Sequence, residues 1–113
     1  MTRPVLPPAV RETLDAFVAG VRGRFGTRTL SIRLFGSYAR GEAHEESDVD
    51  CLVLLDRVDA ADDRFVTDLA ADLVWQLHGV VVSPMIMSDA EFESWKATER
   101  RTPLEIERDG VEL

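Results

Sequence analysis

Two acidic residues, Asp48 and Asp50, stand one residue apart at the start of an apolar run that extends to Leu55. The run has the length and composition of a β-strand, in which residues i and i+2 point to the same face. Both carboxylates are therefore expected to project together. Two negative charges so close repel each other unless a cation lies between them or one carboxylate takes up a proton. Magnesium prefers oxygen ligands and usually binds one or two carboxylates together with substrate phosphates, so this pair is a candidate metal site.

A glycine–serine pair, Gly36-Ser37, precedes the two acids. It follows an apolar run over residues 30–35, which belongs to a predicted first strand over residues 28–35. Residues 37–41 then predict a short helix with Ser37 as its N-cap. The N-terminus of a helix presents free backbone N–H groups and a partial positive charge, which together attract phosphate. A phosphate-binding turn beside a metal-binding pair indicates chemistry on a nucleoside triphosphate.

The combined pattern resembles the signature of the minimal nucleotidyltransferases, a branch of the DNA polymerase β-like superfamily. The resemblance covers most of the chain, and the spacing of the two motifs is more specific than a lone glycine-rich loop. The positions that carry it are Gly36-Ser37-Tyr38-Ala39-Arg40-Gly41, Ser47-Asp48-Val49-Asp50 and the tail from Thr102-Pro103-Leu104 to Arg108-Asp109-Gly110-Val111.

The resemblance implies nucleotidyl transfer, in which a hydroxyl attacks the α-phosphate of ATP or another nucleoside triphosphate and pyrophosphate leaves. Asp48 and Asp50 would be the catalytic residues and would hold Mg²⁺. Gly36 and Ser37 would bind the β- and γ-phosphates, and Arg40 would contact phosphate or support the motif.

One departure from the family pattern leaves two functions open. Active members usually carry a third carboxylate on the next strand, whereas residues 80–87 contain no acid and Ser83 or a neighbour takes the expected place. The chain is therefore either a Mg²⁺-dependent nucleotidyltransferase, with AMP as the expected group, or a catalytically weak or inactive nucleotide-binding subunit that neutralises a partner by contact. Transfer to an antibiotic or another small molecule is a weaker third option.

The resemblance also implies a protein partner. Minimal domains of this family often pair with a separately encoded, all-helical HEPN protein, which implies a toxin–antitoxin system in which some members add AMP to a tyrosine of the toxin. The formal net charge of −8 favours a basic partner surface and argues against broad nucleic-acid binding. Homo-oligomerisation stays open.

The composition is that of one globular domain over residues 1–113, with 45% hydrophobic and 30% charged residues. The single cysteine, Cys51, excludes an internal disulfide and is typical of a reducing cytosol. No signal peptide or apolar run of about 20 residues is present, so the sequence predicts a cytoplasmic chain without a membrane span. Trp75 and Trp95 lie on helix faces and are interpreted as core or interface residues.

The elements expected around the motifs indicate an α+β (mixed α/β) fold, a small mixed sheet covered by helices mainly on one face. In the first strand, Leu30, Ile32 and Leu34 should form the apolar face. Pro84 should place the third strand at a sheet edge or in a bulge, because proline lacks the N–H that a central strand needs. The expected elements are a helix from Pro7-Pro8 to Gly26, strands 28–35, 49–55 and 80–87, a polar loop 42–47, a helix 60–78, a helix capped by Ser88-Asp89-Ala90-Glu91, and an extended or helical closing segment from Pro103.

Overall fold

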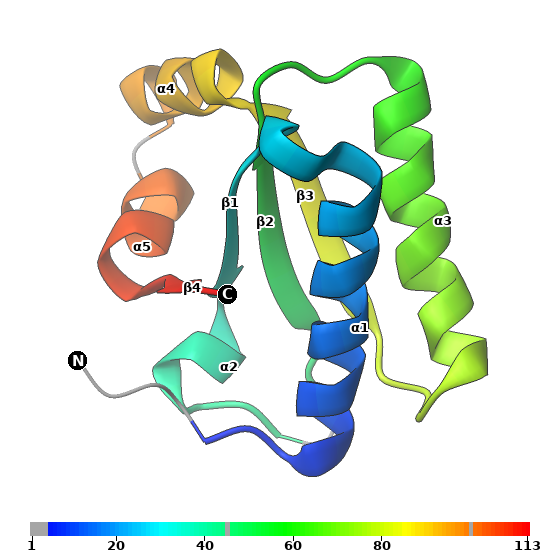
Figure 1. Ribbon diagram of the computed structural model, residues 1–113. Coiled ribbons are helices and arrows are strands. Elements are labelled where there is room, and N and C mark those ends of the chain that lie inside the picture. Colours follow the sequence, from blue (N-terminus) through cyan, green and yellow to red (C-terminus); the bar gives the residue numbers. More distant parts are fainter. Residues whose placement is uncertain (1–4, 45, 100) are drawn as a thin grey trace.

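The computed structural model describes residues 5–44, 46–99 and 101–113 (Figure 1). The helices and strands fall close to the ranges expected from the sequence. In chain order they are α1 (Pro8–Phe25), the 3-10 turn η1 (Gly26–Arg28), β1 (Thr29–Phe35), α2 (Ser37–Arg40), β2 (Val49–Leu55), α3 (Ala60–Gln76), β3 (Val82–Ser88), α4 (Asp89–Thr98), α5 (Arg101–Asp109) and β4 (Val111–Glu112).

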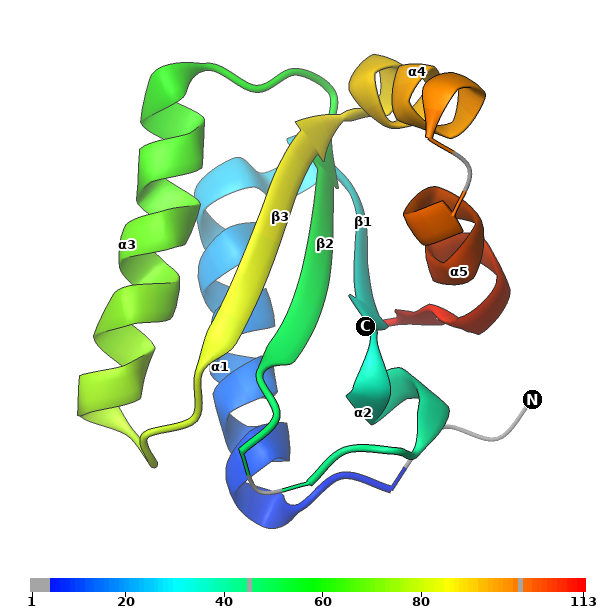
Figure 2. The same ribbon diagram turned by 180° about the vertical axis from the view of Figure 1, so that it is seen from behind.

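The four strands form one mixed sheet in the order β3-β2-β1-β4. β1 runs antiparallel to both β2 and β4, whereas β3 runs parallel to β2 after the crossover through α3. Figure 2 shows β3 at the open edge of the sheet, as Pro84 predicted. The short strand β4, at the opposite edge, brings the closing segment of the chain against β1.

Helices cover both faces of the sheet, not mainly one as expected. α1 and α3 pack on one face, and α4 and α5 pack on the other (Figure 1). The second covering layer arises because the closing segment forms helix α5, whose Ile106 is buried against Phe92 of α4.

Strand β2 separates the two cores by simple alternation. Val49, Cys51 and Val53 face the α1/α3 layer, whereas Leu52 and Leu54 face the α4/α5 layer. Burial raises the pKa of the Cys51 thiol to about 12, with the Asp50 charge as a smaller cause. Cys51 therefore stays a neutral core side chain.

Strand β1 departs from the expected alternation at its first residues. Leu30 is 51% exposed, while Ile32 and Leu34 are fully buried. The register to β2 shifts between Thr29 and Ser31, so the apolar face is established only from Ile32 onwards. Ser31 is itself buried, and its hydroxyl donates to the Glu112 carboxylate at 2.7 Å.

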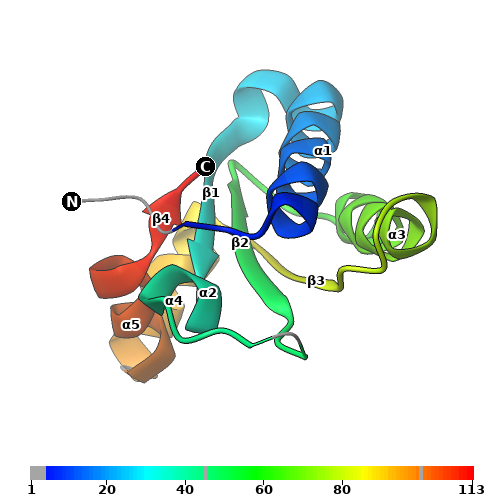
Figure 3. The same ribbon diagram turned by 90° about the horizontal axis from the view of Figure 1, so that it is seen from below.

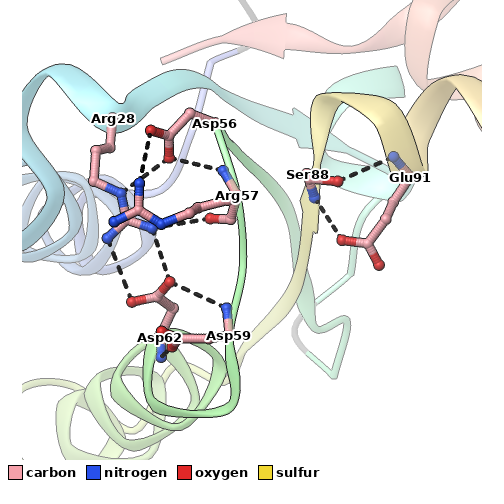
Figure 4. A network of polar contacts seen from close by, with 7 residues as sticks. All are labelled: Arg28, Asp56, Arg57, Asp59, Asp62, Ser88 and Glu91. Atoms are coloured by element: carbon pink, nitrogen blue, oxygen red, sulfur yellow. Dashed lines mark hydrogen bonds and ion pairs between the residues drawn. The ribbon is translucent and has the colours of Figure 1, made fainter.

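Capping boxes fix the starts of α3 and α4. At α4 the Ser88 hydroxyl accepts from the Glu91 amide at 3.1 Å, and the Glu91 carboxylate accepts from the Ser88 amide at 3.0 Å, as the sequence predicted. At α3 the same reciprocal bonds join Asp59 and Asp62. The two boxes thus fix where α3 begins after the loop that follows β2 and where α4 begins immediately after β3 (Figure 4).

Candidate active site

The end of β1 and the start of β2 lie side by side, because the two strands are antiparallel and Phe35 pairs with Asp50. Gly36 leaves β1 with φ +77°, a backbone conformation that L side chains rarely adopt. A Cβ atom at this position would overlap Asp50 Oδ2 and would lie 3.2 Å from Asp50 Cγ. Position 36 therefore requires glycine twice over, once for its φ angle and once for the room that the Asp50 carboxylate takes up.

The two acids of the candidate site lie close enough to influence each other. Burial raises the pKa of Asp50, the Asp48 charge raises it further, and Arg40 lowers it. Asp50 is half-buried on the α4/α5 side of the sheet, while Asp48 is exposed just before β2 begins. This like-charged pair is unfavourable by itself, and a bound cation would relieve the repulsion.

The N-cap of helix α2 (Ser37–Arg40) is Gly36, not Ser37. Gly36 is the N-cap, and its carbonyl accepts from the Ala39 and Arg40 amides at 3.1 and 3.2 Å. The prediction of Ser37 as N-cap is therefore wrong, since Ser37 is the first helical residue and the cap carries no side chain. The Ser37 and Tyr38 amides precede the first amide bonded within this turn.

Arg40, at the end of α2, faces the acids. Its Nε donates to Glu42 Oε2 at 3.1 Å, and its charge lowers the pKa of both Asp50 and Asp109. Arg40 is thus close enough to both Asp50 and Asp109 for its charge to act on each. No local pattern predicts this closeness to Asp109, because the two residues are far apart in the chain.

Position 83 pairs with Asp50 on the neighbouring strand. Ser83 is the Cα partner of Asp50 in the parallel β2–β3 ladder, and it is exposed. Within residues 5–44, 46–99 and 101–113, no group of three His, Cys, Asp or Glu side chains could hold a metal ion. The site thus offers two carboxylates. Two protein ligands suit Mg²⁺, because this ion takes its further ligands from phosphate and water.

A hollow of about 290 Å³ opens directly beside Asp48. Most of its walls come from the loop before β2 and the loop after α3, whose backbones can be followed in Figure 3. The sequence did not predict this hollow, because its walls come from separate segments, one of which begins thirty residues after Asp48. They are Tyr38, Glu46, Ser47, Asp48, His78, Gly79, Val80 and Val81.

Two polar contacts and a glycine turn position the segment after α3 that lines the hollow. The Val49 amide, between the two acids, donates to the Val81 carbonyl at 2.9 Å. His78 Nε2 lies 2.7 Å from Glu12 Oε2 on α1. Gly79 provides a positive φ of 73° at the turn.

The structure brings Gly36, Asp48, Asp50 and Arg40 to one end of the sheet. Ser37 lies at the same end, on the first turn of α2. Of the other polar-loop residues, Glu45 lies outside the described part of the chain.

Both aromatic residues considered near the motifs have clear positions. Tyr38 is 9% exposed and belongs to the core between the sheet and helices α1 and α3. Trp75, by contrast, is 88% exposed in the last turn of α3 and contributes to no core.

Sheet, turn and paired acids together define a nucleotidyltransferase-like domain, and comparison with known proteins assigns the family. A model of the nucleotidyltransferase domain family matches residues 14–104, which include both motifs. The chain belongs to this family.

Named relatives come from archaea. A Methanocaldococcus jannaschii protein named as a protein adenylyltransferase is 36% identical over 81 residues, covering 72% of this chain and 76% of the relative. A second protein of that organism with the same kind of name is 37% identical over 83 residues, but the match spans only 54% of its length. The protein adenylyltransferase MntA of Thermococcus cleftensis is 50% identical over 44 residues, which are 39% of this chain and 42% of that protein.

Solved structures share the fold. One described as a minimal nucleotidyltransferase superposes with a TM-score of 0.60 at 28% identity and covers 92% of both chains. A toxin–antitoxin structure with AMP-PNP superposes with a TM-score of 0.52 at 22% identity, over 85% of this chain and 68% of that chain, and shows likeness of fold alone. In the part of the chain that the structure describes, no helix is both long and apolar enough to span a membrane.

Proposed function

We propose that this chain is a nucleotidyltransferase that transfers AMP from ATP to a hydroxyl group of a protein partner. The observation that carries the proposal is the contact between Gly36 and the Asp50 carboxylate, which joins the phosphate-binding turn to the acidic pair. The names of the archaeal relatives support adenylyl transfer to protein as the reaction of this branch.

Asp48 and Asp50 fit a magnesium site. Asp50 is half-buried beside a second negative charge, and its pKa is raised mainly by burial, so a cation with an incomplete oxygen shell would be favoured there. When bound, Mg²⁺ would neutralise the developing charge of the phosphates. The ion would rely on the nucleotide for further oxygen ligands, because Ser83 offers no carboxylate.

The triphosphate would be bound by the turn into α2. The Ser37 and Tyr38 amides and the Ser37 hydroxyl would donate to its β- and γ-phosphates, and Arg40 would add a positive charge beside the acids. The acceptor oxygen would bond to the α-phosphorus as the bond to pyrophosphate breaks, and the acceptor proton would leave to water. We identify the acceptor with a tyrosine of a HEPN-type toxin, which the toxin–antitoxin context of structures with this fold favours.

A second candidate function is neutralisation of the toxin by contact alone. The observation in its favour is Ser83, which stands in register with Asp50 where a third carboxylate would complete the site. In this case the chain would bind nucleotide and partner but transfer slowly or not at all.

Incubation with labelled ATP, Mg²⁺ and the protein encoded by the adjacent gene separates the two functions. The transferase predicts label on a tyrosine of that protein with the wild type, and none with the variant carrying both Asp48→Ala and Asp50→Ala. Equal labelling by the folded double variant would contradict the proposal. The contact function predicts instead that the double variant still binds and neutralises the partner.

A further inference from the structure

The closing motif of the chain returns to the end of the sheet that carries the candidate site. β4 pairs with β1, and Val111 is the partner of Leu34. The residues just before β4, Asp109 and Gly110, therefore lie beside the point where β1 ends and the turn at Gly36 begins. The end of α5 can be seen next to α2 in Figure 1 and in Figure 3. The proposed function gives this motif no role.

Strand pairing fixes the order of these groups across the end of the sheet. Asp50 of β2 pairs with Phe35 of β1, so the acidic pair lies on one side of the turn that continues β1. β4 lies on the other side of β1. Asp109, the last residue of α5, is therefore separated from the acids by the turn at Gly36. Asp50 and α5 share one face of the sheet, so a ligand can reach from the acids to the end of α5 on that face.

The guanidinium group of Arg108 is oriented by its neighbour. The Asp109 carboxylate accepts from Arg108 Nε at 3.1 Å and from Nη2 at 2.9 Å. An arginine side chain has five N–H donors in a rigid fork, so this pair uses one edge and leaves three donors. Arg108 has no other hydrogen-bond partner among the described residues, and its side chain is 70% exposed. The free edge can bind a phosphate through two parallel hydrogen bonds.

Arg40 brings a second positive charge to Asp109. Hydrogen bonds from Arg108 lower the pKa of the Asp109 carboxyl, and the charge of Arg40 lowers it further. The same Arg40 charge acts on Asp50, against the effect of burial on the pKa of that carboxyl. Two guanidinium groups thus act on one carboxylate beyond the turn. Such a pair of cations suits an anion with more than one negative charge, as a terminal phosphate is.

Gly110 keeps the end of α5 in this position. Its amide donates to the Ile106 carbonyl at 2.8 Å, and a Cβ atom at position 110 would overlap that carbonyl oxygen. Ile106 is fully buried against the sheet, so the tight turn from α5 into β4 is tied to the core. Arg108 and Asp109 are therefore presented from a fixed backbone, which favours precise binding.

Resting on the function proposed above, we propose that Arg108 binds the γ-phosphate of the nucleoside triphosphate and that Asp109 is the residue that positions it. A triphosphate that extends from Asp50 across the turn at Gly36 brings its terminal phosphate to the side of β4, where the free edge of Arg108 lies. A nucleoside diphosphate lacks the group that Arg108 would contact. Arg108 is thus a specificity-determining residue that selects ATP over ADP.

The Arg108→Ala variant tests this role by titration calorimetry with Mg²⁺–ATP and Mg²⁺–ADP in the absence of acceptor protein. The wild type should prefer ATP, and the variant should lose about tenfold or more in ATP affinity with ADP affinity unchanged, because charge-assisted bonds to phosphate are the strong ones. Arg101→Ala is the matched control. Arg101 is exposed at the start of α5, two helical turns or about 10 Å from Arg108, and its loss removes the same charge without changing either affinity.

An ATP-to-ADP preference in Arg108→Ala equal to that of the wild type would overturn the assignment, and so would equal losses for the two nucleotides. Failure of the wild type to bind either nucleotide would contradict the proposed function as well. A wild type that prefers ATP through Arg108 but transfers no label would support this inference and count against the transfer reaction alone.

Asp109→Asn tests the positioning role. Removing a negative charge near the phosphates would by itself raise the affinity for both nucleotides. If Asp109 orients the Arg108 fork, the preference for ATP should instead fall toward that of Arg108→Ala. Arg108→Lys keeps the charge but has no fork, so its ATP affinity should lie between those of the wild type and Arg108→Ala. A higher preference for ATP in Asp109→Asn would overturn the positioning role.

Discussion

Gly36 sets the geometry of the candidate site at the scale of one residue, and Gly41 at the other end of α2 provides its control. Both have positive φ, +77° and +72°, but a Cβ would meet Asp50 only at Gly36 and open space at Gly41. Gly41→Ala should lose about 1–2 kcal/mol of unfolding free energy, because position 41 is in the left-handed helical region. Gly36→Ala should lose more, because its φ of 77° with ψ of −155° is a backbone conformation essentially confined to glycine. Gly36→Ala should also displace the Asp50 carboxylate and weaken Mg²⁺–ATP binding by about tenfold or more, as titration calorimetry would measure. Equal nucleotide affinity of the two variants would refute this role of Gly36.

The ionised Asp50 carboxylate should lower the free energy of unfolding in the absence of metal. Because its folded-state pKa is raised above 3.8, its ionised form is penalised at neutral pH, and the penalty disappears as the pH falls through the raised value toward 3.8. Asp50→Asn should therefore be more stable than the wild type in urea unfolding with EDTA at neutral pH, and the difference should shrink in acid. Added Mg²⁺ should stabilise the wild type and leave the variant unchanged. A variant less stable than the wild type at neutral pH with EDTA would contradict the penalty.

At the scale of elements, the pairing of β2 with β3 shows which position a third carboxylate would occupy. Ser83 is exposed and in register with Asp50, so Ser83→Asp would put a third carboxylate beside the pair without disturbing a core. We expect tighter Mg²⁺ binding and label transfer raised by about tenfold or more, since a positioned proton acceptor typically contributes more than that. Ser83→Asn, of similar size but uncharged, should do neither. Tighter Mg²⁺ binding with no gain in transfer would favour the function by contact.

The elements were predictable to the extent that local signals define them. The capping box at Ser88, the proline in β3 and the apolar run of β2 each act over a few residues, and each prediction from them is confirmed. Leu30 was misplaced because the register shift at the start of β1 depends on pairing with β2. The second helical layer was missed because helix α5 gains its burial from α4 and β2.

The site was predictable only in part for the same reason. The Gly36-Ser37 and Asp48–Asp50 motifs can be recognised by their spacing, and antiparallel pairing of β1 with β2 necessarily brings them together. The hollow beside Asp48 depends on how the loop after α3 returns to β3, which no local pattern encodes. Tertiary contacts, not residue types, therefore define the surface beside Asp48.

At the scale of the whole molecule, the two ends of the sheet carry different groups of residues. The acids and the turn lie at one end, and an ion-pair network around Arg28 lies at the other (Figure 4). Arg28 donates to Asp56 at 2.9 Å and to the buried Asp62 at 2.8 Å, and so ties the start of β1 to the β2–α3 connection. These bonds to Arg28 lower the pKa of both carboxylates, so the stability they contribute is present above pH 3.8 and is lost as the pH falls through the lowered values.

Arg28→Ala should therefore lower the thermal midpoint by several degrees at neutral pH, with a smaller difference from the wild type in acid, while leaving the site intact. A ligand that binds only the folded state adds about 2.7 kcal/mol at a hundred times its Kd. A nonhydrolysable ATP analogue with Mg²⁺ should thus stabilise Arg28→Ala as much as the wild type, and should stabilise Gly36→Ala far less at the same concentration. Scanning calorimetry with and without the analogue measures both effects. Loss of the ligand-induced stabilisation in Arg28→Ala would mean that the two ends are coupled through β1 and β2, and that the strands transmit strain from the network to the acids.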